Sequence, residues 1–201
     1  MVNWRPAAGT ALIILVFGAG DLLVTTLFQD ILQVPLFFDT IFMMAALFAF
    51  GPVQAFLEYL VFVGLACVKL KLLYGRTDMV YLYALAALTI IAVTWLFVHK
   101  KERFSKGVNR AFLCILSASM LAGLACSVVS GFISYFTHRL DVKDWAFNRI
   151  IFAFNGEQLG YLASSIVGRI PVTMLDRVIT TFAGFGIARL YRRLAGSGGI
   201  P

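Results

Sequence analysis

The sequence predicts an all-α integral membrane protein, a bundle of six transmembrane helices with a short second helix and a long loop before the last helix. Hydrophobic residues make up 61% of the 201-residue chain, charged residues make up 13%, and the mean hydropathy is +0.89. A soluble domain is about 25% charged, so this chain has too little polar surface to disperse in water. We expect one transmembrane domain over residues 1–195 and a flexible tail at 196–201.

Five apolar segments reach the roughly 20 helical residues needed to cross about 30 Å of hydrocarbon. They cover residues 8–28, 53–73, 79–98, 111–136 and 171–191. The first segment continues past Asp21 to Phe28, which favours an uncleaved span. A cleaved secretory signal, which has a shorter apolar core, is the alternative.

A sixth, shorter helix is expected over residues 37–50. Its 14 residues reach only about 21 Å at 1.5 Å each, so we expect it to pack among longer helices. Gly51 and Pro52 then force a turn into the next helix. Six spans place both termini on one side of the membrane.

The distribution of basic residues favours cytoplasmic termini. With that orientation the inner side carries nine Lys and Arg residues and the outer side carries seven, and cytoplasmic loops are typically richer in basic residues. The nine are Arg5, Lys100, Lys101, Arg103, Lys106, Arg110, Arg189, Arg192 and Arg193. The net charge of +7 is therefore interpreted as contact with anionic lipid rather than with nucleic acid.

The 33 residues from 137 to 169 form the least ordinary part of the chain. Their core, 146–168, is apolar but contains Asn155 and Glu157. Burying such groups in a seventh span costs about 2.5–3.5 kcal/mol for each central charge. We expect a lid or a re-entrant element at the outer face, and an extra span is the remaining alternative.

Motifs for catalysis and metal binding are absent from the sequence. It contains no GxxxxGK[ST] phosphate loop, no HExxH, no GxSxG and no CxxC pair. Cys67, Cys114 and Cys126 all lie in apolar runs and are expected to act as packing residues. We therefore expect no enzymatic activity, no metal and no cofactor.

Ionisable residues within spans are costly and mark candidate sites. Asp176 and Arg177 lie near the outer end of the last span. Two interpretations are equally supported: a rim that contacts a ligand, or an ion pair between helices with Asp39 or Glu58. Asp39 itself is expected to cap the short helix, and Glu58 to form hydrogen bonds between helices.

Small residues on two spans predict close helix packing. Ser119, Gly123, Ser127, Ser130 and Ser134 recur at spacings of three and four on the 111–136 span. Such a stripe allows another helix to approach closely. Ala7 and Ala11 form a similar step at the start of the first span, where a close crossing within the chain is the simpler interpretation.

Two stretches carry a family resemblance. Residues 34–42 read VPLFFDTIF and are followed by Gly51-Pro52, and residues 169–179 read RIPVTMLDRVI and are followed by Gly184-Phe185-Gly186. They resemble the P-x-x-x-D-T opening of a short second helix and the P-V-x-x-x-D opening of the last helix in the S components of energy-coupling factor (ECF) transporters. Six helices and about 200 residues are also typical of that family.

The resemblance implies a substrate-binding subunit of an ABC importer in the cytoplasmic membrane of a bacterium or archaeon. Such a subunit captures a vitamin or other micronutrient at the outer face, while a separate transmembrane scaffold and two ATPases supply the energy. The implied substrate-binding residues are Asp39, Asn155, Glu157, Arg169, Asp176 and Arg177. Ala7 and Ala11 occupy the place of the family's scaffold contact. The long loop before the last helix departs from the family's shorter versions.

Two other functions remain as alternatives. Similar membrane segments occur as sensor modules that signal to a kinase or cyclase. A membrane enzyme acting on lipid or isoprenoid substrates is the third hypothesis, and the lack of clustered catalytic residues disfavours it.

Overall fold

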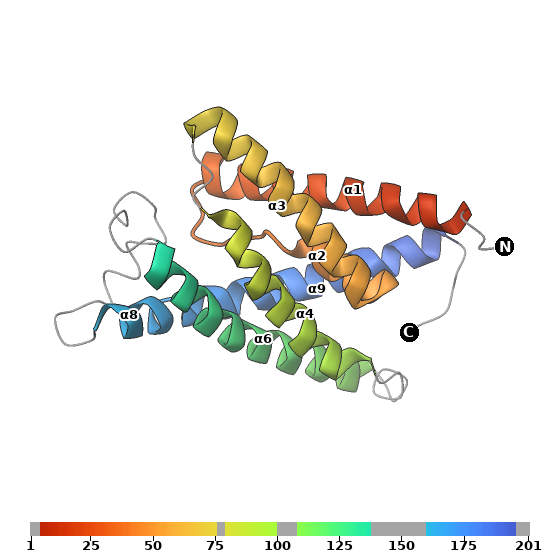
Figure 1. Ribbon diagram of the computed structural model, residues 1–201. Helices are drawn as coiled ribbons and strands as arrows, with labels where there is room; N and C mark the ends of the chain where they lie inside the picture. Colours follow the sequence, from red (N-terminus) through yellow and green to blue (C-terminus); the bar gives the residue numbers. More distant parts are fainter. Residues whose placement is uncertain (1–4, 76–78, 100–107, 138–159, 196–201) are drawn as a thin grey trace.

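Helices account for all the regular secondary structure in the residues that the computed structural model describes, which are 5–75, 79–99, 108–137 and 160–195. Figure 1 shows how they are arranged. The longer elements are α1 (Arg5–Thr25), α3 (Pro52–Tyr74), α4 (Ala84–Val98), α6 (Val108–Thr137) and α9 (Ile170–Leu194). The shorter ones are the π-helix η1 (Thr26–Ile31), α2 (Ile41–Phe50), the 3₁₀ turn η2 (Val80–Tyr83) and α8 (Tyr161–Val167). The expected tail at 196–201 lies outside the described residues.

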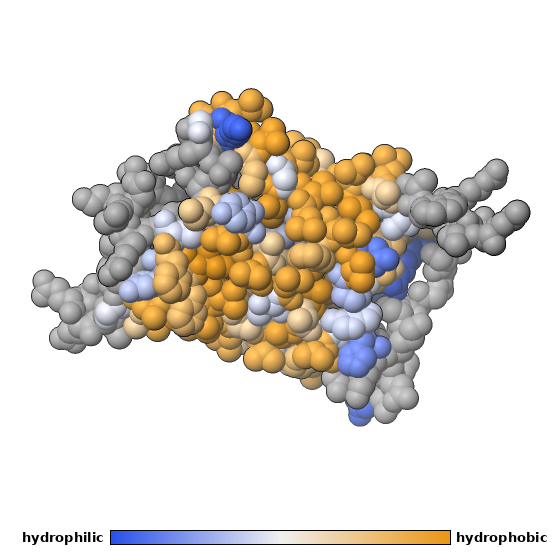
Figure 2. Space-filling view, in the orientation of Figure 1, coloured by the Kyte–Doolittle hydropathy of each residue, from blue (hydrophilic) through white to orange (hydrophobic). Residues whose placement is uncertain are grey.

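Four helices are long and apolar enough to cross a membrane. They cover Gly9–Ile31, Val80–Val98, Asn109–Thr137 and Leu162–Leu194. Figure 2 shows a broad apolar surface across the middle of the molecule, and Leu12, Leu23 and Leu96 are each more than 60% exposed. An exposed apolar surface of this extent suits lipid. The 23-residue α3 contains Glu58 and Lys69 and is not among these four, so the count of six spans stays a prediction.

The short second helix is shorter than expected and lies within the bundle. It begins at Ile41 rather than at residue 37 and has 10 residues, a length of about 15 Å. Residues 32–40 take an irregular path, in which Gln33 and Phe38 adopt positive φ angles of 51° and 50°. Because the helix is so short, its amino-terminal end lies inside the bundle.

α2 forms the core of the fold. It packs against α1, α3 and α9, and Met43 through Ala46 are completely buried. The helix ends at Gly51, whose φ of 111° suits glycine, and Pro52 begins α3. The turn predicted at Gly51-Pro52 is therefore confirmed.

The two ends of the bundle have different components. The start of α1 and the end of α9 lie at one end (Figure 1). The irregular segment 32–40 and α8 lie at the opposite end (Figure 1). We call the first the terminal end and the second the loop end. Assignment of the terminal end to the cytoplasm stays a prediction.

The described part of the expected lid is a seven-residue helix. α8 packs against α6, where a side chain on Gly131 would overlap Ile166. Seven residues are too few to cross a bilayer, and only Gly168 and Arg169 separate α8 from α9. The rest of the 146–168 core lies outside the described residues.

Gly184 lets α9 approach α2 at backbone distance. A Cβ at this position would lie 2.6 Å from Met44 Cβ and 2.8 Å from Ile41 O. We expect Gly184→Ala to lower the free energy of unfolding by about 1–3 kcal/mol through overpacking. Gly186→Ala is the matched control, because a Cβ there meets nothing within 4 Å and alanine favours the helix by about 0.5–1 kcal/mol. Thermal unfolding in detergent measures both, and equal stability of the two variants would contradict the packing.

Candidate functional site

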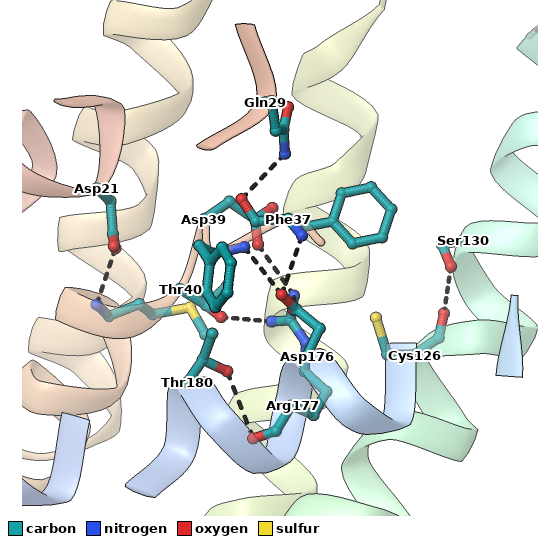
Figure 3. Close-up of polar contacts among 12 residues, drawn as sticks. Asp21, Gln29, Phe37, Asp39, Thr40, Cys126, Ser130, Asp176, Arg177 and Thr180 are labelled. Carbon is teal, nitrogen blue, oxygen red and sulfur yellow. Dashed lines mark hydrogen bonds and ion pairs between the residues drawn. The ribbon is translucent and has the colours of Figure 1, made fainter. Parts of the chain in front are cut away.

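The irregular segment 32–40 is held by the start of α9. Asp176 Oδ1 accepts hydrogen bonds from the backbone nitrogens of Phe37 and Phe38, at 3.0 and 2.9 Å (Figure 3). Backbone groups outside regular structure need such partners when water is absent. From the other side, the Gln29 side-chain amide donates to the Phe37 carbonyl oxygen at 2.9 Å. The segment is thus fixed between η1 and α9.

Arg177 joins the same segment to α9 by ionic contacts. Its Nη2 atom donates to Asp39 Oδ1 at 2.9 Å and to Asp176 Oδ2 at 2.5 Å, and its Nη1 atom donates to the Thr40 hydroxyl. Figure 3 shows these groups converging. We call Asp39, Thr40, Asp176 and Arg177 the junction cluster.

The junction cluster is largely dry, except at Asp39. The side chains of Asp176 and Arg177 are 0% and 3% exposed, whereas that of Asp39 is 21% exposed. Two carboxylates share one guanidinium, so the three ionised side chains carry one excess negative charge. A buried pair is stable when both partners are present and well bonded, and removal of one partner is strongly destabilising.

The contacts of Arg177 agree with one of the two interpretations drawn from the sequence. Arg177 forms the interhelical ion pair, and its partner is Asp39 rather than Glu58. The other interpretation, a rim that contacts ligand, stays a prediction. It fits Asp39 best, because that is the one carboxylate of the cluster that solvent reaches.

The expected capping role of Asp39 is wrong. Thr40 is the N-cap residue of α2, and its side chain makes no capping hydrogen bond. Asp21 of α1 supplies the acceptors instead, since its two carboxyl oxygens each lie 3.1 Å from a backbone nitrogen, those of Phe42 and Met43. A carboxylate here both pairs the free N–H groups and opposes the positive end of the helix dipole. Asp39 is drawn away by Arg177.

Arg169 belongs to a neighbouring network at the same end of the bundle. Its Nη2 atom donates to the Ser134 hydroxyl of α6, which also forms a 2.9 Å hydrogen bond with the Tyr83 hydroxyl. Arg169 is 5% exposed. The structure therefore brings Asp39, Asp176 and Arg177 into one cluster and places Arg169 in another. Asn155 and Glu157 lie outside the described residues.

The small-residue stripe of α6 packs helices together, as predicted. A side chain on Gly123 would lie 2.9 Å from Met174 Cα. Ser127 and Ser130 donate to carbonyl oxygens of their own helix. At the terminal end, Ala11 is exposed on α1. Ala7 lies in the first turns of the same helix.

Sequence reasoning missed Gln29, Thr40 and Tyr83 as parts of these networks. Gln29 and Tyr83 stand next to apolar residues with no motif around them, so no sequence signal indicated their partners. Thr40 was visible in the D-T pair but had no assigned contact.

The described residues contain no group of three or more His, Cys, Asp or Glu side chains that could hold a metal ion. Comparison of the chain with known proteins finds no matching family model, no matching curated protein and no matching solved structure. The chemistry of the loop end rests on the side chains described above.

Replacing Arg177 tests the structural role of the junction cluster. Arg177→Leu leaves Asp176 buried beside Asp39 without a cation, and we expect a loss of about 3–5 kcal/mol in unfolding free energy. Arg189→Leu makes the same change at an exposed position of the same helix and should shift stability by at most about 0.5 kcal/mol. Denaturant unfolding in detergent compares them. A mild effect at Arg177 would show that the ion pair does not hold the segment.

Proposed function

We propose that this chain is the substrate-binding membrane subunit of an ECF-type ABC importer, which captures a vitamin or other micronutrient for uptake. Capture takes place at the outer face of a bacterial or archaeal cytoplasmic membrane, and the loop end is that face. A separate transmembrane scaffold and two ATPases power the transport.

One observation carries the proposal: the two stretches that resemble the family are in direct contact. They lie more than 130 residues apart in sequence, yet Asp176 binds the backbone of Phe37 and Phe38, and Arg177 binds Asp39. Both stretches lie at the loop end, to which the long connection before α9 also leads. Residues from separate elements thus meet at one place, as expected of a ligand site.

The burial pattern divides the roles within this site. Asp176 and Arg177 are dry and saturate one another, so they position the segment 32–40. Asp39 is held in place by Arg177 and remains partly exposed, so its carboxylate is free to accept hydrogen bonds from a small polar ligand. A ligand with amine, amide or hydroxyl donors suits such a group.

Asp39→Asn tests the site without removing its packing. We expect at least a tenfold loss of affinity, about 1.4 kcal/mol, because the amide carries no charge and accepts fewer hydrogen bonds. The ligand is first found by mass spectrometry of small molecules retained on the purified chain. Its affinity is then measured by titration calorimetry against a panel of water-soluble vitamins.

Asp30→Asn is the matched control, since Asp30 is 44% exposed at the same end and pairs with Lys69. It should bind like the unchanged protein. A chain that is folded and monodisperse but binds none of the vitamins contradicts the proposal, as does equal binding by the Asp39 and Asp30 variants.

The start of α1 is the proposed scaffold contact, through Ala7 and Ala11. A large side chain at this step should block close helix approach. We expect Ala11→Trp to abolish co-purification with the scaffold and ATPase subunits while ligand affinity is retained. Leu23→Trp, at a 71% exposed position on the same helix, should co-purify normally. Recovery of a kinase or cyclase instead of ATPases would favour the sensor function.

A further inference from the structure

Two buried carboxyl groups face each other beside the start of α2. Asp21 belongs to α1 and Glu58 to α3, and both are 0% exposed. Asp21 is the charged group that acts most strongly on Glu58. Both lie well inside the helices that carry them, far from the chain ends of the bundle. Ionisable side chains at such depth indicate function more often than stability.

The two acids differ in their hydrogen-bond partners. Each oxygen of Asp21 accepts a backbone N–H from the first turn of α2, and the helix dipole favours negative charge there. Neither oxygen of Glu58 has a hydrogen-bond partner among the described residues. Asp21 is therefore in a site built for a carboxylate, and Glu58 is not.

No cation compensates Glu58 within the packed elements that surround it. α2 and α4 contain no titratable residue, and α1 contributes Asp21. The irregular segment contributes Asp39, which adds further negative potential. The Arg177 guanidinium of α9 is already bound to Asp39, Thr40 and Asp176. An ionised Glu58 would be a buried, unpaired charge beside a second carboxylate, and such pairs retain a proton.

We infer that Asp21 and Glu58 form a buried proton-binding site, in which Glu58 is a neutral carboxylic acid whose O–H is directed to the Asp21 carboxylate. The proton replaces the missing cation and lets α1 and α3 pack together beside α2. Its loss would place two like charges in the dry core next to the amino-terminal end of α2. This inference concerns the resting protein and does not depend on the proposed function.

Infrared spectroscopy tests the site directly, because a protonated carboxylic acid has a carbonyl stretch separate from those of carboxylates and amides. We expect the difference spectrum between the unchanged protein and Glu58→Gln at neutral pH to contain one such band, which shifts in D₂O. Asp30→Asn, at an exposed carboxylate, should give no such band. A difference spectrum that shows only carboxylate bands for Glu58 overturns the inference.

Stability provides a second measurement, since glutamine imitates the neutral acid and loses no proton. The melting temperatures of the unchanged protein and Glu58→Gln should be similar at neutral pH. Raising the pH should lower that of the unchanged protein relative to the variant, because only Glu58 can become charged. A difference in melting temperature that is independent of pH contradicts the proton site. If Glu58→Gln fails to fold, the same infrared comparison is made with Glu58→Asp, where the acid band should move rather than vanish.

Discussion

The fold depends on satisfying the amino-terminal end of α2 within the bundle, away from water. A helix that spans the membrane places its free N–H groups near the headgroups, but the 10-residue α2 begins deeper. Asp21 accepts two of these N–H groups, and Asp176 accepts the N–H groups of the segment that leads into the helix. Arg177 then offsets the negative charge. The polar residues of the core are thus consequences of one short helix.

That arrangement also explains why the loop end is suited to binding. The space that α2 leaves unfilled is occupied by the irregular segment 32–40, fixed by contacts from η1 and α9. A segment held by side chains instead of a helical ladder presents Asp39 at its edge, where solvent reaches it. Rigid support beneath a partly exposed polar group is the arrangement that small-ligand sites require.

The sequence predicts this architecture better than its contacts. Apolar segment lengths located the helices, and Gly51-Pro52 located the turn into α3, because these signals are local. The pairing of Arg177 with Asp39 was one of two interpretations of the last span. The capping of α2 by Asp21 was missed, since the two lie 20 residues apart and an N-cap is normally sought beside the helix it caps. The irregular path of residues 32–40 was also missed, because its apolar residues match a helical pattern while Asp176 offers their backbone another partner.

The sidedness of the loop end tests the account most directly, because capture of a nutrient requires Asp39 to face the cell exterior. With Cys67, Cys114 and Cys126 replaced by alanine, single cysteines are placed at Leu32, exposed at the loop end, and at Ala195, exposed at the terminal end. Intact cells are treated with a membrane-impermeant thiol reagent. The account predicts labelling at position 32 without permeabilisation and at position 195 only after it. The reverse pattern, or labelling of both positions from outside, would contradict it.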